Sequence, residues 1–361
     1  LGLVYLPVEA ATSDMYGGER HGNNLFGNSL VAVDVKTGER RWHQQLVHHD
    51  IWDWDNPTAP ILLDVNVDGR PVKAVVQLTK QAFAYAFDRA TGEPLWPIEE
   101  RPVPPSDVPF EWTSPTQPFP TKPAAYDRQG VGEGDLVDFT PAINAAALED
   151  VKSLPMGPMF TPPSLIEAPD GTRGTLVLPH YGGGANWEGG AADPETGMLY
   201  VASQTSLTVF AVSPAGDRSD IRYLFVNGEA PRPMGLPLVK PPYGRITAID
   251  MNSGEHRWMA VNGDTPDDIK YNPALAGVTI PPTGKASRAT LLVTKTLLFA
   301  GEGYGGDPIL RAYDKATGAV VAEIPLPGAA SSKPMTYMLD GKQYVVLAVG
   351  RDVPAELVAF S

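Results

Sequence analysis

The residues best suited to chemistry lie close together in one short segment of the chain. Residues 48–55 (His-His-Asp-Ile-Trp-Asp-Trp-Asp) include two histidines, three carboxylates and two tryptophans, whereas charged residues are only 19% of the whole chain. Lys80 follows Asp53 by 27 residues. Such a cluster is costly to bury unless its groups are paired, bind a metal or take part in proton transfer. The alternative interpretation is a solvated surface loop.

Composition and charge argue against several classes of function. With 28 basic and 42 acidic residues the net charge is −14, which disfavours nucleic acid or an anionic membrane surface as a partner. The chain has no cysteine, so a disulfide framework, a thiolate zinc site and a cysteine nucleophile are excluded. No apolar run reaches the ~18 residues of a membrane-spanning helix. Residues 1–6 read as a strand rather than a signal peptide, so we expect a mature fragment or a truncated chain.

A five-residue motif, Asp-x-x-Thr/Ser-Gly, recurs along the chain. Each copy follows a short apolar or alternating run, and three copies have a tryptophan eight residues after the Asp. The motif predicts a hairpin turn in which the Asp and Thr side chains bond the turn backbone and the Gly takes a positive φ. The copies begin at Asp34, Asp88, Asp193, Asp250 and Asp314, and the tryptophans are Trp42, Trp96 and Trp258.

The spacing of this motif predicts the fold class. Successive copies are 54, 105, 57 and 64 residues apart, and periods of this size carried by strands indicate the blades of a β-propeller. The longest interval contains a proline-rich insertion at about residues 97–163, which we expect to pass over one face of the molecule. A short helical turn is expected within it, at residues 141–151. We therefore expect a single all-β domain over residues 1–361 with about five blades.

Several longer motifs resemble those of one enzyme family. The resemblance is carried by residues 48–55, residues 78–81 (Leu-Thr-Lys-Gln), residues 111–123 and residues 183–187 (Gly-Gly-Ala-Asn-Trp). These segments are similar to the quinoprotein dehydrogenases, which use pyrroloquinoline quinone (PQQ), and in particular to their glucose-dehydrogenase branch. The resemblance implies a propeller of eight blades, each with four antiparallel strands. Because this chain carries about five, the resemblance also implies an N-terminally incomplete domain whose missing part holds further metal ligands and cofactor contacts.

The resemblance assigns roles to four residues around the cofactor. Asp53 matches the general base, which accepts the proton of a substrate hydroxyl while a hydride leaves its carbon for the quinone. Lys80 matches the cation that bonds the quinone oxygens and stabilises their charge during reduction. Asn186 and Trp187 match the pair that lines the cofactor pocket. From the residues alone, the alternatives are a turn Asp, an edge-strand Lys and a glycine-rich loop.

The same resemblance implies metal and substrate contacts. Calcium or magnesium is the expected metal, because both ions prefer oxygen ligands. Thr12, Asp53 and Asp55 are the candidate metal ligands, and His49 is a candidate for the substrate pocket. The glucose-oxidising branch carries Lys at the position of Lys80, where alcohol-oxidising relatives carry Arg. This difference favours an aldose or a polyol as substrate.

The resemblance further implies a bacterial oxidoreductase that works in the periplasm or on the extracellular face. Its partners would be a small sugar or alcohol and a quinone or cytochrome that accepts the electrons, and a part outside this chain could attach it to the membrane. Two alternatives stay open: a quinoprotein alcohol dehydrogenase, and a non-catalytic propeller scaffold of the cell envelope. Fold alone cannot separate them. A scaffold, however, has no need to keep Asp53, Lys80 and the Asn186–Trp187 pair together.

Overall fold

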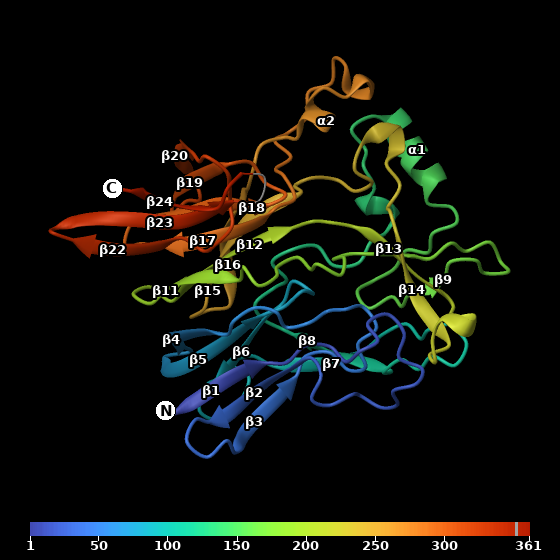
Figure 1. The fold of residues 1–361 in the computed structure, drawn as a ribbon, viewed down its shortest axis with the longest axis horizontal. Helices are drawn as coiled ribbons and strands as arrows, with labels where there is room; N and C mark the ends of the chain where they lie inside the picture. Colours follow the sequence, from blue (N-terminus) through green and yellow to red (C-terminus); the bar gives the residue numbers. More distant parts are fainter. Residues whose placement is uncertain (351–352) are drawn as a thin grey trace.

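Five β-sheets stand side by side and form the body of the molecule. The computed structural model describes residues 1–350 and 353–361. Figure 1 shows the sheets fanning from the N-terminal strands at the bottom of the view to the C-terminal strands at its upper left. Neighbouring strands within these five sheets are antiparallel. The prediction of an all-β chain with about five blade-like units is confirmed.

The first two sheets have three strands each among the described residues. They pack on each other through buried apolar side chains, with Leu30 and Trp42 from one sheet and Val75 and Phe87 from the other. Their strands are β1 (Leu3–Pro7), β2 (Ser29–Asp34) and β3 (Arg40–Gln45), then β4 (Ile61–Val67), β5 (Arg70–Leu78) and β6 (Ala84–Asp88).

The next three sheets continue the stack. Shared apolar clusters join the second sheet to the third, the third to the fourth and the fourth to the fifth. The third sheet contains β11 (Gly190–Asp193), β12 (Met198–Gln204), β15 (Gly244–Asp250) and β16 (Glu255–Val261). The fourth contains β17 (Arg288–Val293), β18 (Leu297–Tyr304), β19 (Ile309–Asp314) and β20 (Val320–Pro325). The fifth contains β21 (Ala329–Ala330), β22 (Met335–Leu339), β23 (Lys342–Gly350) and β24 (Glu356–Phe360).

The long interval between motif copies forms a separate layer beside the blades. It begins with the two-stranded ribbon β7 (Ile98–Pro102) and β8 (Thr116–Pro120), whose prolines lie outside any multi-stranded sheet interior. The expected helical turn is a ten-residue helix, α1 (Pro141–Asp150), whose first turn is capped by Thr140 Oγ1 accepting from the Ile143 amide at 3.2 Å.

This layer extends further along the chain than residues 97–163. Short strands β9 (Ser164–Leu165) and β10 (Thr175–Val177) both pair with β13 (Thr208–Pro214), which also pairs with β14 (Tyr223–Gly228). Residues 164–177 and 208–228 therefore form a further sheet outside the stack, on the right of Figure 1. A four-residue helix, α2 (Asp267–Lys270), follows β16. No helix among the described residues is long and apolar enough to span a membrane.

The recurring motif forms the predicted turn. In the first copy, Asp34 Oδ1 accepts from the backbone nitrogens of Lys36 and Thr37 at 2.9 and 3.1 Å, and Gly38 has a φ of 74°. The copies at Asp88 and Asp314 repeat both amide bonds, and all five terminal glycines have positive φ. The turns at Asp34, Asp193, Asp250 and Asp314 each join two paired antiparallel strands, whereas the turn at Asp88 leads from β6 to the ribbon strand β7. Gly adopts the positive φ of these turns without the steric cost that another residue would have.

Two of the three motif tryptophans pack on the glycine of the next copy along the chain. A Cβ built on Gly92 would lie 2.7 Å from Trp42 Cδ2, and one built on Gly318 would lie 2.6 Å from Trp258 Cε3. The Trp258 indole nitrogen also donates to the Lys315 carbonyl at 3.1 Å. These contacts link one sheet to its neighbour, so the motif closes a turn and also fixes the spacing between blades.

Candidate functional site

A buried carboxylate shapes the loop that carries Asp53. Asp50, which is 1% exposed, accepts from the backbone nitrogens of Trp52 and Trp54, each at 2.8 Å, and from Asn28 Nδ2 at 2.9 Å. The two indole rings are buried and stack with centroids 5.4 Å apart. Asp53, between them, has a φ of 55°, a costly region for a non-glycine residue. This packing holds Asp53 in place with its side chain 23% exposed.

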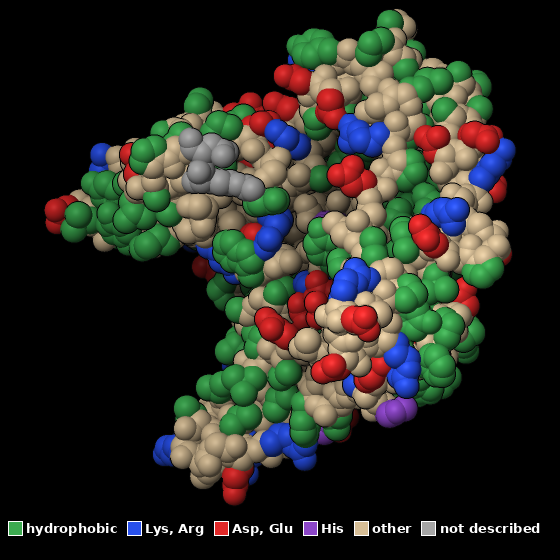
Figure 2. Space-filling model, turned by 45° about the vertical axis from the view of Figure 1, so that its right-hand side comes forward, with side chains coloured by type: hydrophobic (Ala, Val, Ile, Leu, Met, Phe, Trp, Pro, Cys, Tyr) green, Lys and Arg blue, Asp and Glu red, His purple; other side chains and the backbone are tan. Residues whose placement is uncertain are grey.

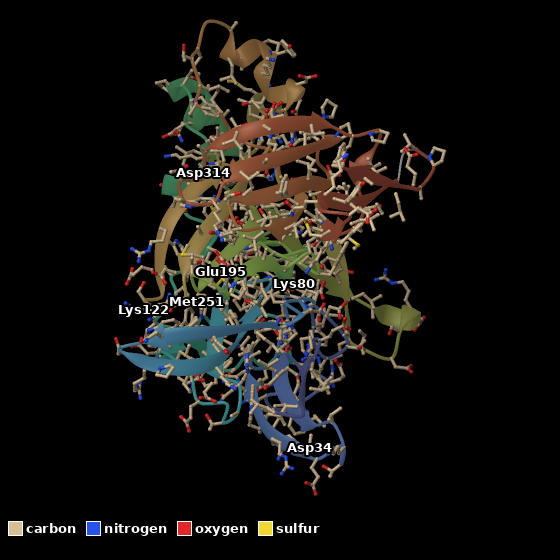
Figure 3. The ribbon with its side chains drawn as sticks, turned by 90° about the vertical axis from the view of Figure 1, so that its left-hand side faces the viewer. Asp34, Lys80, Lys122, Glu195, Met251 and Asp314 are labelled. Carbon is tan, nitrogen blue, oxygen red and sulfur yellow. The ribbon has the colours of Figure 1, made fainter. Side chains whose placement is uncertain are left out.

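Lys80 joins Asp53 to Asp55. It follows β5, and its Nζ lies 2.8 Å from Asp55 Oδ2, 3.2 Å from Asp53 Oδ1 and 2.7 Å from the Asp53 carbonyl oxygen. The Lys80 side chain is only 6% exposed. Figure 3 shows Lys80 near the middle of the molecule, between the blue N-terminal strands and the green strands. The structure thus brings together three residues singled out from the sequence.

The two carboxyls of this cluster have opposite pKa shifts. Burial raises the pKa of Asp53 to about 8; the positive charge of Lys80 opposes this shift and the negative charge of Asp55 adds to it. For Asp55, burial is outweighed by the Lys80 charge and by the Ala10 amide, which donates to Oδ1 at 2.6 Å, so its pKa is lowered. Asp55 is therefore the ionised partner of Lys80. Asp53 is a carboxyl that can exchange a proton near neutral pH.

The glycine-rich loop packs directly on Lys80. The Gly184 amide donates to the Lys80 carbonyl at 2.9 Å, and a Cβ built on Gly183 would lie 2.7 Å from Lys80 Cα. The close approach that these glycines allow is to the backbone of Lys80. The loop then continues into Asn186, whose Nδ2 donates to the Gly182 carbonyl at 2.9 Å.

Arg288, at the start of β17, organises the Asn186–Trp187 pair. Its Nη2 donates to Asn186 Oδ1 at 3.0 Å, its guanidinium lies 5.7 Å from the centroid of a Trp187 ring, and its Nε lies 2.8 Å from Glu188 Oε1. The Trp187 indole is 46% exposed. Trp187, Glu188 and Arg288 line a cavity of about 320 Å³. Arg288 and Glu188 were not expected from the sequence, because a lone Arg before an apolar strand and a Glu in a glycine-rich loop carry no local signal.

Thr12 is exposed, and its segment reaches the site through Ala10. The bond from the Ala10 amide to Asp55 holds the backbone two residues before Thr12 against the cluster. The assignment of Thr12 as a metal ligand stays a prediction, which rests on its position two residues after Ala10.

His49 belongs to a different buried group. Its Nδ1 donates to the Gly22 carbonyl at 2.8 Å and its Nε2 lies 3.2 Å from Glu111 Oε1; the two side chains are 0% and 2% exposed. The ring also packs edge-on against Trp112, with centroids 4.8 Å apart. These contacts tie the loop of residues 48–55 to the insertion. The role of His49 toward a substrate stays a prediction.

The groups around Trp187 and Lys80 suit a flat anionic ligand. An exposed indole offers a stacking surface, and the Arg288 guanidinium and the Lys80 ammonium carry positive charge. Both cations are already paired, Arg288 with Glu188 and Lys80 with Asp55, so carboxylate or quinone oxygens would share them with these partners. Groups that could bind a metal ion are fewer than those that could bind the cofactor. Among the described residues, no group of three or more His, Cys, Asp or Glu side chains is arranged to hold a metal ion. Asp53 and Asp55 supply two carboxylates, and Lys80 lies between them.

Blade-like sheets around a Lys–carboxylate pair, with an Asn–Trp pair beside it, define a quinoprotein type of propeller. A family model described as "PQQ: Glucose/ethanol/alcohol dehydrogenase, beta-propeller domain" matches residues 1–345. The chain belongs to this family. The resemblance noted from the sequence and the β-propeller fold class are both confirmed.

Individual relatives agree with this family. The chain is 31% identical to the glycerol dehydrogenase large subunit of Gluconobacter oxydans, over 97% of the chain and 50% of that protein. It is 29% identical to quinoprotein glucose dehydrogenase A of Acinetobacter calcoaceticus, over 97% of the chain and 45% of that protein. It is also 30% identical to a probable quinate dehydrogenase of Xanthomonas campestris, over 97% and 46%. The chain spans about half the length of the curated relatives it matches.

Solved structures share the fold. The quinohemoprotein alcohol dehydrogenase ADHIIG of Pseudomonas putida HK5 matches with a TM-score of 0.60 at 23% identity, over 97% of this chain and 43% of that one. A europium-containing methanol dehydrogenase matches with a TM-score of 0.59 at 20% identity, over 97% and 49%. At these identities the match supports the propeller architecture alone.

Proposed function

We propose that this chain forms part of a PQQ-dependent dehydrogenase that oxidises a CH–OH group, with Asp53 as the general base. The observation that carries the proposal is the cluster of Asp53, Lys80 and Asp55. It pairs a carboxyl that can exchange a proton near neutral pH with a fixed cation and a second, ionised carboxylate. Membership of the PQQ family supports the cofactor.

Each residue of the cluster has a task in this proposal. PQQ, when bound, supplies the carbon that accepts a hydride from the substrate. Asp53 in its ionised form accepts the proton of the substrate hydroxyl at Oδ1 or Oδ2. A divalent cation bound beside it would favour this ionised form. Lys80 holds the Asp53 backbone and places positive charge where the cofactor oxygens would gain electrons. Asn186 and Trp187, which Arg288 orients, would contact the cofactor.

A divalent metal is part of the proposal. Asp53, Asp55 and Thr12 would be oxygen ligands to Ca²⁺ or Mg²⁺, ions that take about six or more oxygens. Further ligands beyond these three would then be required. His49 is proposed to contribute to the substrate pocket from a greater distance. Its contact with Glu111 anchors the loop that carries it.

The proposed substrate is an aldose or a polyol. Relatives at about 30% identity are named for glycerol, glucose and quinate, all polyhydroxylated compounds. Lys80 supports the sugar or polyol branch through the resemblance stated above, and a simple alcohol is the second candidate. The electrons would pass to a quinone or cytochrome at the periplasmic or extracellular face. A non-catalytic scaffold explains the fold but gives no reason for the Lys80 cluster.

The proposal is tested by Asp53→Asn, assayed together with PQQ and calcium by dye-coupled oxidation of aldoses, polyols and short alcohols. Asn has nearly the same shape but cannot accept the proton, so turnover should fall by about 10²-fold or more, the contribution typical of general-base catalysis. PQQ binding should be largely retained. Asp64→Asn is the matched control, since Asp64 is 67% exposed on β4. Full activity in Asp53→Asn would remove Asp53 from the base role, and absent PQQ binding by the parent chain would favour the scaffold.

A further inference from the structure

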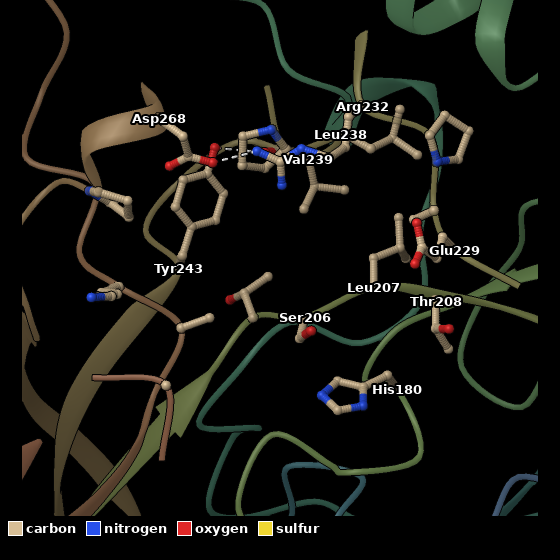
Figure 4. Close-up of a pocket in the computed structure, with 18 of the residues that line it drawn as sticks. His180, Ser206, Leu207, Thr208, Glu229, Arg232, Leu238, Val239, Tyr243 and Asp268 are labelled. Atoms are coloured by element: carbon tan, nitrogen blue, oxygen red, sulfur yellow. Dashed lines mark hydrogen bonds and ion pairs between the residues drawn. The ribbon is translucent and has the colours of Figure 1, made fainter. Parts of the chain in front are cut away.

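A second cavity opens beside the same glycine-rich loop, away from the Asp53–Lys80 cluster. Its volume is about 590 Å³, within the ~300–1,000 Å³ typical of small-molecule sites. Its wall is formed by the loop at His180, the strands β13 and β14, and segments 229–243 and 266–269 (Figure 4). Asp53, Asp55 and Lys80 are not among its lining residues.

One side of this cavity carries small neutral polar groups. Figure 4 shows Ser206, Thr208 and His180 on this side, and Asn227 of β14 also lines the cavity. Burial, together with the positive charges of Lys80 and Arg288, lowers the pKa of His180 to about 4, so its ring is neutral at pH 7. Hydroxyl and amide groups can each donate or accept a hydrogen bond, as ligand hydroxyls require. The His180 ring offers Nε2 alone, because its Nδ1 already accepts from the Gly182 amide.

The opposite side combines apolar surface with two cations that are already paired, and Glu229 adds a negative charge to the lining. Leu238, Val239 and Tyr243 supply the apolar surface. Arg232 Nη2 lies 2.5 Å from Asp268 Oδ2, and Lys285 Nζ lies 2.6 Å from Asp307 Oδ1. An anionic ligand would have to compete for these cations. A neutral ligand with both hydroxyls and C–H surface fits the lining without breaking either pair.

A single tight turn separates this cavity from Lys80. The Gly182 amide donates to His180 Nδ1 at 2.9 Å, and the Gly183 amide donates to the His180 carbonyl at 2.7 Å. The next amide, that of Gly184, donates to the Lys80 carbonyl. His180 and Lys80 are thus held by adjacent backbone bonds of one loop.

We propose that this cavity binds a neutral polyhydroxylated molecule, a polyol or a sugar, against His180, Ser206 and Asn227, next to the reaction centre. If the proposed function holds, on which this role rests, the cavity is a site where the substrate binds before it reaches the reaction centre. The bound polyol replaces water on the hydroxyl-lined side and covers the apolar side with its C–H groups.

The test is binding of D-sorbitol to the intact chain without PQQ, followed by ligand-observed NMR or calorimetry. Saturable binding is expected, together with weaker binding of the anion D-gluconate. Ser206→Leu fills the cavity from one wall and Asn227→Leu fills it from another, and each should weaken sorbitol binding about tenfold or more. Ser153→Leu is the matched control, because Ser153 is exposed and lies outside the lining. Thermal unfolding of each variant confirms that it is folded.

Asp53→Asn separates the two polyol sites. Sorbitol binding that survives Asp53→Asn and is lost in Ser206→Leu and Asn227→Leu supports the cavity. Loss of binding in Asp53→Asn with retention in both cavity variants, or no saturable binding by the parent chain, would overturn it. The binding test does not depend on turnover. Sorbitol binding here, combined with no turnover in the dye-coupled assay described above, would contradict the proposed function and leave a polyol site standing. Turnover without sorbitol binding in this cavity would support the proposed function and refute the polyol site.

Discussion

His180 is a residue outside the Asp53–Lys80 cluster whose pKa is strongly shifted by its surroundings. Its partly buried ring lies near the cationic groups of Lys80 and Arg288, and its pKa falls from an ordinary value of 6.5 to about 4. The unfolded chain therefore binds a proton at a pH where the folded chain does not. Between pH 6.5 and pH 4 this difference favours unfolding as the pH is lowered.

We predict that the unfolding free energy falls by up to about 3 kcal/mol from this residue as the pH drops from 6.5 to 4. His180→Gln removes the titrating group, so its loss of stability over that range should be smaller by a similar amount. Urea unfolding at pH 7 and at pH 4.5 measures both. His21→Gln, which changes an exposed histidine, is the control and should keep the parent slope. Parallel pH profiles for the parent and His180→Gln would contradict the prediction.

Single residues also mark how far the sequence could lead to the site. Asp53 and Lys80 were found because an unusual run of His, Asp and Trp and a family resemblance both pointed to them. Arg288 and His180 were not found, because each joins the site through backbone and side-chain contacts that depend on folding. The contact from Arg288 to Asn186 spans 102 residues of sequence and leaves no periodic trace.

At the scale of the elements, the turn motif was predictable and its partners were not. Asp, Thr and Gly act within five residues, so local chemistry decides the turn. The tryptophan eight residues on is visible in the sequence as part of the repeat, but the glycine it packs against lies in another sheet. In the off-stack sheet, β9 and β10 were missed because strands of two or three residues give no readable alternation. The longer strands β13 and β14 carry no copy of the turn motif, so the repeat did not point to them.

The tryptophan contact is testable by paired glycine substitutions. Gly38 and Gly92 occupy the same place in two motif copies, with φ of 74° and 79°. A Cβ at Gly38 meets nothing within 4 Å, whereas one at Gly92 meets Trp42 at 2.7 Å. Gly38→Ala should therefore cost about 1 kcal/mol for the backbone alone.

Gly92→Ala should cost a further 1–3 kcal/mol or so, the usual range for forcing an extra carbon into a packed site. Gly318→Ala, against Trp258, should behave in the same way. Urea unfolding of the three variants measures the difference. Equal losses in Gly38→Ala and Gly92→Ala would mean that the indole moves aside and does not set the spacing between sheets.

At the scale of the whole molecule, the five stacked sheets form an open arc. Figure 2 shows two projections on either side of a hollowed face. Inner sheets are packed between two neighbours, whereas the first and last sheets of the described chain each have one. Exposed apolar side chains lie on both of these outer sheets: Leu1, Val4 and Leu6 at one end, and Met335, Met338, Leu339 and Leu357 at the other.

These outer faces resemble the surfaces that the inner sheets bury against their neighbours. Large exposed apolar patches and open sheet edges favour association. The relatives are about twice as long as this chain, and in a closed ring of blades both faces would be covered. We therefore predict that this chain, studied by itself, associates through its outer sheets as its concentration rises.

Sedimentation velocity over a range of about 1–100 µM, where contacts of modest affinity become populated, measures this association. Leu357 is 76% exposed on β24, and Leu357→Lys should shift the chain toward monomer by placing a charge on the outer face. Leu148→Lys changes a leucine that is 36% exposed on α1, away from the outer sheets, and should leave the association unchanged. A chain that stays monomeric at every concentration would contradict the prediction and show that the outer faces can stay exposed to water without driving association. Of the two leucines, only Leu357 lies where a neighbouring blade would pack, so the two variants should differ. Equal effects would instead assign the association to general surface hydrophobicity.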